Sequence, residues 1–402
     1  MNIPIQLNKI LGKTGERISS TFLVNFVVVS IGLVTNILIA RLFGQENFGV
    51  YSYFFGLTNL IYIFAGFGLV NSVAKLTKEN LSKNLVKKII LFLVAASFIF
   101  SLIAYYVGNV FELNPDINYF FISVFGYSMV ICIFMMLSGA IRRLEKYELA
   151  TYFSLYNRII LISLVIVIGF IGKFWWIFPA MAFAILFLLP FEFKRGSFSK
   201  KAQKLIPLLK TSLPFFLSII GVNAIYHIDR ISIKFVFDFI SLGYYTGFAN
   251  YVNILRTGAY VIPFVMITAS ARKKFDISKS VKKLIILLVP ISIGIGFTAP
   301  IIVPFLFGSE YSQINYLLIW SMVLSCTLLV IYSLINSLYL SKTHNKIKNY
   351  ILFLDALLST AINMGLNILL ISRIGLAGAP IATSIVLSAK IALNRYGIKT
   401  LS

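Results

Sequence analysis

Apolar runs of about 20 residues recur along the whole chain, and they constrain the fold more than any other feature. A helix needs about 20 mostly apolar residues to cross the hydrocarbon core of a bilayer. Twelve runs reach this length, at residues 19–40, 49–73, 89–110, 117–140, 149–171, 174–192, 213–236, 243–270, 284–307, 313–340, 349–371 and 375–394. They are continuous rather than alternating, which excludes a membrane β-barrel. The sequence therefore predicts an all-α polytopic membrane protein with about 12 transmembrane helices.

The composition excludes the other broad classes. Of 402 residues, 59% are hydrophobic and 12% are charged, whereas soluble globular chains have about 45–50% apolar and about 25% charged residues. With 37 Phe and 21 Tyr, the chain is too apolar to be disordered. Both cysteines, Cys132 and Cys326, fall inside predicted spans, so neither a disulfide framework nor a metal site is indicated. No small-residue cleavage site follows the first run, which we expect to be an uncleaved span.

The basic residues indicate the orientation in the membrane. The chain has 36 Lys and Arg and a formal net charge of +23. Twenty-nine of them fall in seven segments on one side, among them a C-terminal segment with Lys390, Arg395 and Lys399. The opposite loops hold four: Arg41, Lys173, Lys234 and Arg373. By the positive-inside rule both termini are cytoplasmic. Because the basic residues are dispersed beside the membrane, they indicate contact with anionic lipids rather than with nucleic acid.

A motif occurs twice, about half the chain length apart. Residues 41–52 begin with a basic residue and end in Gly49-Val-Tyr-Ser, and residues 234–246 begin with a basic residue and end in Gly243-Tyr-Tyr-Thr. A glycine at this place suits the tight connection between antiparallel spans. Repeats six spans apart have the same orientation in the membrane. We therefore expect two six-helix lobes, residues 1–200 and 201–402, around a central cavity, although apolar helices joined by glycine loops can also look alike by chance.

Three segments resemble a known family. The first is Ala40-Arg-Leu-Phe-Gly44 followed by Phe48-Gly-Val-Tyr-Ser52, the second is Ile228-Asp-Arg-Ile231 followed by Leu242-Gly-Tyr-Tyr245, and the third is residues 375–383. All three are similar to the Wzx-type polysaccharide flippases of the multidrug/oligosaccharidyl-lipid/polysaccharide exporter superfamily. The resemblance implies that the chain moves an undecaprenyl-pyrophosphate-linked oligosaccharide, the repeat unit of an O-antigen or capsule, from the cytoplasmic to the periplasmic leaflet of the bacterial inner membrane.

Once the charged residues assigned to loops and termini are set aside, five remain within the membrane: Arg158, Arg230, Arg256, Asp229 and Asp355. Charges at this depth usually face a cavity or each other. Arg158 and Arg256 lie near the midplane, and a guanidinium pairs bidentately with phosphate oxygens, so we expect both to bind the pyrophosphate. An Arg–Asp lock between helices, or a side chain that reaches the interface, would explain them equally. For Arg230 the adjacent Asp229 favours a structural role over substrate binding.

Polar side chains at helical spacing indicate a polar face on two spans. The eighth span carries such a face at Thr246, Asn250, Asn253 and Thr257, with Tyr260 following, and the eleventh carries a smaller one at Thr360, Asn363 and Asn367. In hydrocarbon these groups must face helices or water. We expect Asn250 and Asn253 to contact the sugars of the substrate. Hydrogen bonds between helices are the alternative.

The two intramembrane acids are candidates for energy coupling. A desolvated carboxylate binds a proton or a cation, so we expect Asp229 or Asp355 to couple transport to a proton or sodium gradient, as in an antiporter. His227 lies on the opposite side of its helix from Asp229 and is expected to pack. No cofactor is expected.

No enzymatic constellation is present, because the sequence has no nucleotide-binding loop, no Ser/His/Asp set and no metal-ligand spacing. Three other classes remain open. A drug or small-cation exporter of the same superfamily would need more buried acids, a polysaccharide polymerase or ligase would need a large outer loop, and a scaffold or lipid scramblase would not need paired lobes. The expected partners are the lipid-linked oligosaccharide, membrane lipids and other polysaccharide-assembly membrane proteins.

Overall fold

The computed structural model describes residues 13–76, 81–115, 120–144, 147–195, 204–256, 277–342 and 346–399. These residues are nearly all helical and form no β-strand. Eight helical stretches among them are long and apolar enough to cross a membrane, and two of these, Phe26–Gly66 and Leu352–Arg395, each run through two predicted spans. The prediction of an all-α polytopic membrane protein is confirmed.

The first six predicted spans correspond to seven helical elements. These are α2 (Lys13–Gly66), α3 (Leu69–Lys75), α4 (Lys83–Val110), α5 (Phe120–Arg142), α6 (Tyr147–Ile171), the 3-10 turn η1 (Phe174–Trp176) and α7 (Ile177–Arg195). The first span and most of the second are within α2, which is interrupted at Gly44, and the second ends in α3. Gly44 has φ +81° and ψ 171°, a conformation that only glycine adopts without strain. The chain therefore turns between the first two spans at this residue.

The last six spans include two that are interrupted by π-helical turns. The seventh consists of α8 (Leu205–Ile219), the π turn η2 (Ile220–Ala224) and α9 (Ile225–Val236), and α10 (Phe239–Val252) begins the eighth. The ninth is α12 (Ile277–Phe307), followed by η3 (Ser309–Tyr311), and the tenth is α13 (Tyr316–Lys342). The eleventh consists of α14 (Lys346–Leu357), the π turn η4 (Leu358–Ile362) and α15 (Asn363–Ile374). The twelfth is η5 (Gly375–Ala377) and α16 (Gly378–Lys399). Thr257 and Tyr260 of the eighth span lie outside the described residues.

The two copies of the repeated motif lie against each other through their glycines. A Cβ placed on Gly49 would lie 1.8 Å from the carbonyl oxygen of Phe239, and one placed on Gly243 would lie 2.0 Å from that of Gln45. Gln45 Nε2 also donates to the carbonyl oxygen of Ile240 at 2.9 Å. The role expected for these glycines, in the turn itself, is wrong. Gly44 makes the first turn and the N-cap Asp238 begins α10, while Gly49 and Gly243 allow close backbone approach.

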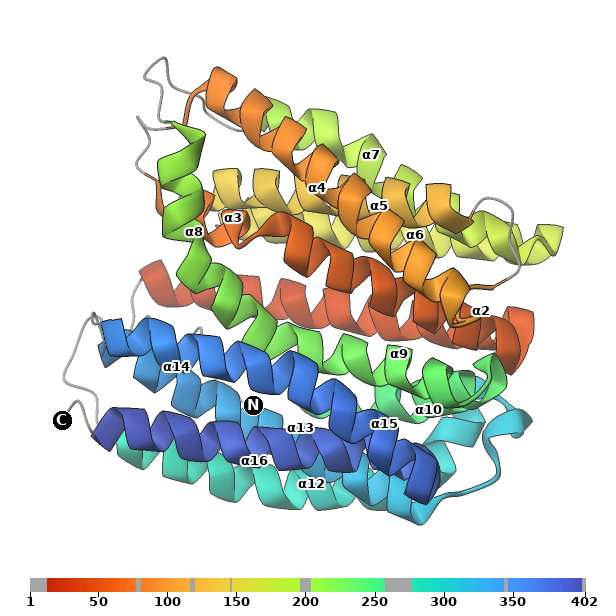
Figure 1. The fold of residues 1–402 in the computed structure, drawn as a ribbon. Coiled ribbons are helices and arrows are strands. Elements are labelled where there is room, and N and C mark those ends of the chain that lie inside the picture. The colour runs from red at the N-terminus through yellow and green to blue at the C-terminus, as the bar shows by residue number, and fades with distance from the viewer. Residues whose placement is uncertain are drawn as a thin grey trace. The chain divides into compact units, whose positions relative to one another are not determined.

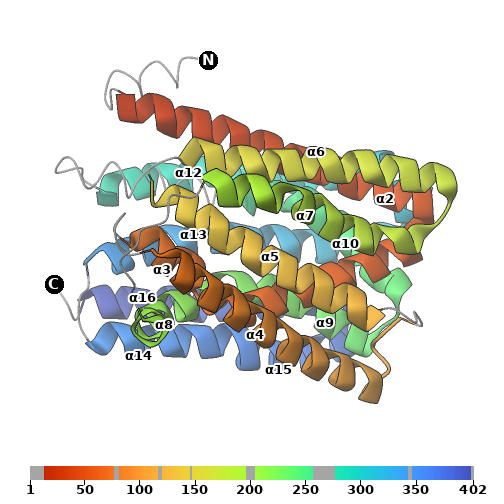
Figure 2. The same ribbon diagram turned by 90° about the horizontal axis from the view of Figure 1, so that it is seen from above.

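The described residues divide into two compact units, which interleave in sequence. Unit 1 contains the described residues within 1–22, 44–49 and 228–402, and unit 2 contains those within 23–43 and 50–227. In unit 2, α5 lies between α4 and α7 (Figure 2). The ring of Phe54 packs there against Phe120, Tyr127 and Phe178. The predicted lobe boundary at residue 200 falls outside the described residues and stays a prediction.

In unit 1, α16 is the helix that contacts both the tenth and the eleventh spans. It packs along α13 and α15 and also contacts α14 (Figure 1). The spans on either side of it are therefore close enough to exchange hydrogen bonds with side chains on α16. The π turn η4 lies between α14 and α15 on the eleventh span, and π turns of this kind occur frequently at functional sites.

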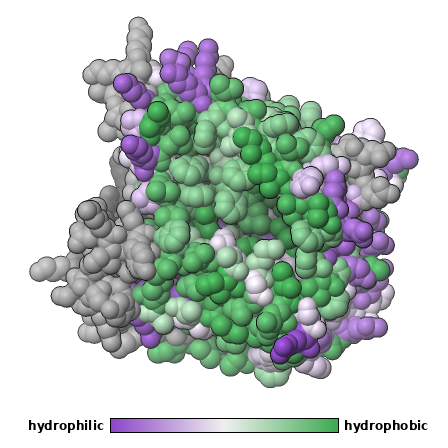
Figure 3. Space-filling view, viewed as in Figure 1, coloured by the Kyte–Doolittle hydropathy of each residue, from purple (hydrophilic) through white to green (hydrophobic). Residues whose placement is uncertain are grey.

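The surface agrees with a membrane location. Large apolar side chains are widely exposed, for example Phe170 (90% exposed), Ile301 (74%) and Phe305 (75%). In the view of Figure 3 hydrophobic residues cover most of the face, and hydrophilic residues gather toward the helix ends. Lipid would cover such a face, because exposed apolar area of this extent is not found on soluble monomers.

Candidate functional site

The carboxylate of Asp229, on α9, is buried among hydrogen-bond donors from three other helices. Asp229 is 2% exposed. Thr383 Oγ1 lies 3.0 Å from Oδ1 and 3.1 Å from Oδ2, Asn367 Nδ2 donates to Oδ1 at 2.8 Å and Asn363 Nδ2 lies 3.5 Å from it. The hydroxyl of Tyr245 donates to Oδ2 at 3.3 Å. We call these five residues the Asp229 cluster.

Helical spacing explains how the cluster forms. Asn363 and Asn367 lie one turn apart on α15, and both are fully buried. Thr383 is in the first part of α16, which packs on α15, and Tyr245 is on α10. The polar face predicted for span eleven therefore points at a carboxylate from span seven. The alternative given for that face, hydrogen bonding between helices, is what these two asparagines do.

All four donors to Asp229 are electrically neutral, and the carboxylate forms no ion pair with any described residue. A buried charge is costly unless a cation or a proton compensates it. Asn367 Oδ1 has no hydrogen-bond partner among the described residues. Turning this amide over would present its oxygen instead of its NH₂ group. The Asp229 cluster thus offers carboxylate, amide and hydroxyl oxygens at one point, which suits a proton or a hard monovalent cation.

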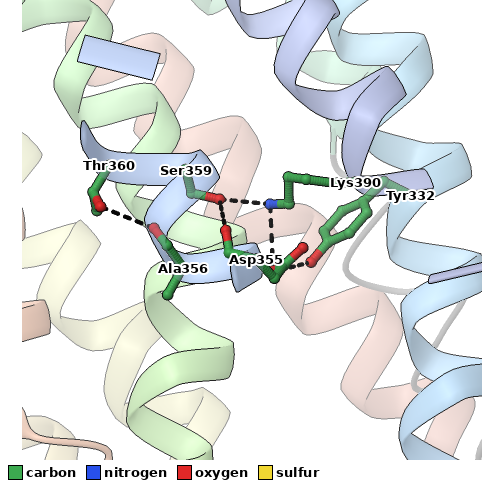
Figure 4. A network of polar contacts seen from close by, with 6 residues as sticks. All are labelled: Tyr332, Asp355, Ala356, Ser359, Thr360 and Lys390. Atoms are coloured by element: carbon green, nitrogen blue, oxygen red, sulfur yellow. Dashed lines mark hydrogen bonds and ion pairs between the residues drawn. The ribbon is translucent and has the colours of Figure 1, made fainter. Parts of the chain in front are cut away.

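Asp355, on α14, has a different environment. Lys390 Nζ lies 3.6 Å from Asp355 Oδ2 and donates to Ser359 Oγ at 2.7 Å. The hydroxyl of Tyr332 donates to the same Oδ2 at 2.7 Å, and Lys390 Nζ lies 4.0 Å from the centre of the Tyr332 ring. Figure 4 shows the ammonium group among these three side chains. We call Tyr332, Asp355, Ser359 and Lys390 the Asp355 cluster.

The two arginines expected to bind pyrophosphate lie in different units. Arg158 is half-buried on α6 of unit 2, where a Cβ placed on Gly32 would lie 3.8 Å from its Cζ. Arg256 is half-buried in unit 1. Substrate binding by either arginine stays a prediction.

The other predicted substrate residues occupy the seventh and eighth spans. Asn253 Oδ1 accepts a hydrogen bond from the thiol of Cys326 at 3.7 Å, so its amide faces α13. Asn250 is half-buried, one turn earlier on α10. Arg230 is half-buried and follows Asp229 on α9. His227 contacts the ring of Phe55 and does not join the Asp229 cluster, as expected for a packing residue.

Comparison with known families decides the class of the chain. A model of the family described as polysaccharide biosynthesis protein matches residues 15–269, more than half of the sequence. The chain belongs to this family. No curated protein sequence matches it significantly. The matched part contains Asp229 and the three intramembrane arginines, whereas the donors on α15 and α16 lie beyond it.

Solved structures of transporters share the fold of this family member. The lipid II flippase MurJ in an inward closed conformation is 16% identical, with a TM-score of 0.69 over 94% of this chain and 87% of that one. The MATE multidrug transporter DinF-BH is 15% identical, with a TM-score of 0.64 over 99% and 96%. An inward-facing multidrug resistance MATE family transporter of the MOP superfamily is 15% identical, with a TM-score of 0.63 over 92% and 94%. These likenesses show the fold.

Sequence reasoning missed Lys390, Tyr332 and Thr383. The assignment of Lys390 to a cytoplasmic segment is wrong, because Lys390 is fully buried and paired with Asp355. A signal was present, since Lys390 lies within the predicted span 375–394 and two turns after Thr383 on the same helix face. Tyr332 gave no such signal among the many tyrosines of the chain.

Proposed function

We propose that this chain is a flippase that moves an undecaprenyl-pyrophosphate-linked oligosaccharide, an O-antigen or capsular repeat unit, from the cytoplasmic to the periplasmic leaflet of the bacterial inner membrane by alternating access. The observation that carries this proposal is the family match over residues 15–269. The fold alone does not separate a flippase from a drug exporter, because MurJ and the multidrug transporters both have it. The family match favours the oligosaccharide.

A cation or proton at Asp229 drives the cycle in this proposal. The support is the buried carboxylate with only neutral donors, on a span interrupted by a π turn. Coupling-ion sites of secondary transporters are typically built on discontinuous helices. Binding of a cation would draw α9, α15 and α16 together around Asp229, and its release would loosen them. The affinity for the ion then differs between the two conformations, as coupling requires.

The substrate's pyrophosphate is bound by arginine in this proposal. Arg256 and Arg158 each keep a half-buried guanidinium inside a predicted span, and a guanidinium that stays charged pairs with phosphate oxygens in a planar fork. Asn250 contacts the sugars. The amide oxygen of Asn253 is engaged by Cys326, so a sugar contact would use its NH₂ group.

Glycolipid movement tests the substrate. Vesicles that contain the protein are loaded with the lipid-linked oligosaccharide on one leaflet, and its appearance on the other is measured with an impermeant glycan-modifying reagent. We expect R256A and R158A to lose transport, R256K to recover it partly, and R373A, at an exposed arginine on α15, to behave as the parent. Normal transport by both R256A and R158A would contradict arginine binding. Export of a cationic dye without glycolipid movement would contradict the substrate class.

The driving ion is tested in the same vesicles. Imposed sodium and proton gradients are varied one at a time, with D229N and T383A as variants. We expect one gradient to accelerate transport in the parent and neither to do so in D229N. A parent protein that transports equally under all gradients would contradict coupling at Asp229.

A further inference from the structure

The environment of Lys390 has the chemistry of a binding site for a primary ammonium ion. Its Nζ atom contacts a hydroxyl oxygen of Ser359 at 2.7 Å and a carboxylate oxygen of Asp355 at 3.6 Å, and it lies 4.0 Å from the ring centre of Tyr332. A carboxylate, a hydroxyl and an aromatic face are the groups that bind alkylammonium ions. The lysine and the carboxylate are 0% and 2% exposed.

The partners of the ammonium group come from helices other than its own. Asp355 and Ser359 are on the eleventh span and Tyr332 is on the tenth, whereas Lys390 is on α16. Tyr332 also donates to the carboxylate oxygen that faces Lys390, so the tyrosine positions the acid as well as covering the ammonium. Figure 4 shows the lysine reaching from its own helix into this group. The three residues that contact the ammonium group, Asp355, Ser359 and Tyr332, therefore all lie outside α16.

Comparison with the Asp229 cluster supports the same interpretation. Both clusters combine a buried aspartate, a tyrosine hydroxyl and a serine or threonine hydroxyl, and both join span eleven to α16. The difference is the cation. The Asp229 carboxylate has only neutral partners among the described residues, whereas the Asp355 carboxylate has an ammonium group that is covalently part of the chain.

We propose that Asp355, Ser359 and Tyr332 form a binding site for a primary ammonium group, which the chain fills with its own Lys390. The side chain acts as a tethered ligand that cannot leave, so this site fastens spans ten, eleven and twelve together. Asp355 then takes no exchangeable ion. The proposal concerns binding and stability, so it does not depend on the proposed function.

Shortening the tether should turn the internal ligand into an external one. Lys390→Ala removes three methylene groups and the ammonium, which together correspond to propylammonium. Purified K390A in detergent should melt at a lower temperature than the parent, and propylammonium chloride should restore the melting temperature in a saturable way, because a ligand that binds only the folded state stabilises it. Neither the parent nor K87A, at an exposed lysine of α4, should respond.

The two cysteines of the chain provide the readout. Both are buried, so a thiol-reactive fluorescent dye labels them only on unfolding. In a C132S background the remaining thiol, Cys326 on α13, reports on unit 1 alone. Restoration by 1-propanol would show that filling the space is sufficient, and equal restoration by NaCl would show a general salt effect. Either result would overturn the proposal, as would restoration of D355N/K390A, which lacks the carboxylate.

A second comparison decides the question if K390A cannot be purified. K390M keeps the apolar stem and leaves Asp355 without its cation, while D355N/K390M removes both charges. We expect a low yield and low melting temperature for K390M and recovery of both in the double variant. A double variant that is as poor as K390M would contradict the proposal, because the loss would then not come from the unfilled carboxylate.

Discussion

Asp229 and Asp355 are both buried acids on interrupted spans, and both are contacted by α16, yet the chain treats their charges differently. Asp229 is surrounded by two amides and two hydroxyls, which can stabilise a carboxylate without neutralising it. Asp355 is neutralised by Lys390. The difference teaches that burial of an acid in a membrane protein does not by itself indicate coupling. An exchangeable ion requires that the chain leave the charge uncompensated.

The largest expected effect comes from removing the ion pair between Asp355 and Lys390. K390M leaves an unpaired buried carboxylate, and removing one partner of a buried ion pair costs about 3–5 kcal/mol. The free energy of unfolding should fall by about that amount, measured by denaturant or thermal unfolding in detergent. D355N/K390M should recover most of it. A decrease in the free energy of unfolding of less than about 1 kcal/mol for K390M would mean that the Asp355–Lys390 pair is exposed to solvent, which would contradict its burial in the structure.

The D229N substitution tests the role of the uncompensated charge at Asp229. The amide keeps the size and most hydrogen bonds of Asp229 but removes the charge that would hold a cation. We expect the gradient-dependent part of transport to fall on the order of 100-fold, the upper part of the range typical of coupling free energies, with little loss of thermal stability. Sodium binding to the purified protein, measured by radiolabelled equilibrium binding, should disappear if sodium is the ion. Unchanged acceleration by the gradient in D229N would place the coupling site elsewhere.

Two tyrosine substitutions sharpen the comparison as a matched pair. Tyr332→Phe removes a hydroxyl 2.7 Å from Asp355, and Tyr245→Phe removes one 3.3 Å from Asp229. A hydrogen bond to a charged group contributes about 1.5–3 kcal/mol and weakens as it lengthens. Tyr332→Phe should therefore lower the free energy of unfolding more than Tyr245→Phe does. The opposite order would indicate that the Asp229 carboxyl is ionised in a larger fraction of the resting protein than the Asp355 carboxyl is.

The smallest effect comes from an acid outside the spans, Asp238. The backbone N–H of Ser241 donates to Asp238 Oδ1 at 2.7 Å, and this bond holds the pKa of the carboxyl below its usual value. A lowered folded-state pKa gives stabilisation that is complete above the unfolded pKa of about 3.9 and is lost as the pH falls through the folded pKa. D238N should abolish this acid-dependent loss, which we expect to be about 0.3–1 kcal/mol.

The comparison of the parent and D238N from pH 6 down to pH 2 measures that loss. Equal pH dependence of the two proteins would show that the N-cap carboxyl makes no contribution. Asp238 is exposed and caps a helix, whereas Asp229 is buried in a span. We therefore expect D238N to change only the acid stability of the protein, and D229N to change its gradient-dependent transport.

The sequence predicts the spans and part of the Asp229 cluster, and the rest depends on tertiary contact. Asn363 and Asn367 stand out because amides one turn apart in an apolar run are visible in the sequence. Their target could not be predicted, because Asp229 lies 134 residues before Asn363 and is brought to it only when α9 packs beside α15. Thr383 is one hydroxyl among many, and hydroxyls in spans usually bond to their own helix.

At Lys390 the positive-inside rule, which places basic residues in cytoplasmic loops, conflicts with the pairing of buried charges inside the protein. Charge counting assigns a lysine near the end of a span to the cytoplasm. It fails at Lys390 because an acid on a neighbouring helix lies at the same depth. Gly49 and Gly243 are a similar case, since the sequence shows that glycine recurs but not which backbone comes close to it.

The π turn η4 joins the two clusters on span eleven. In an uninterrupted α-helix, residues eight apart such as Asp355 and Asn363 would point about 80° apart around the axis. A π turn winds fewer degrees per residue, so η4 rotates α15 back and brings the two clusters onto one face. Such a turn is in effect a one-residue insertion. A single deletion within residues 358–362 would restore the regular helix and place Asn363 seven residues after Asp355, about 20° away around the axis, so the shared face would be kept. Converting the π turn to regular α-helix without shortening the chain would instead turn Asn363 and Asn367 away from Asp229. The two clusters therefore depend on a match between the length of this segment and its winding.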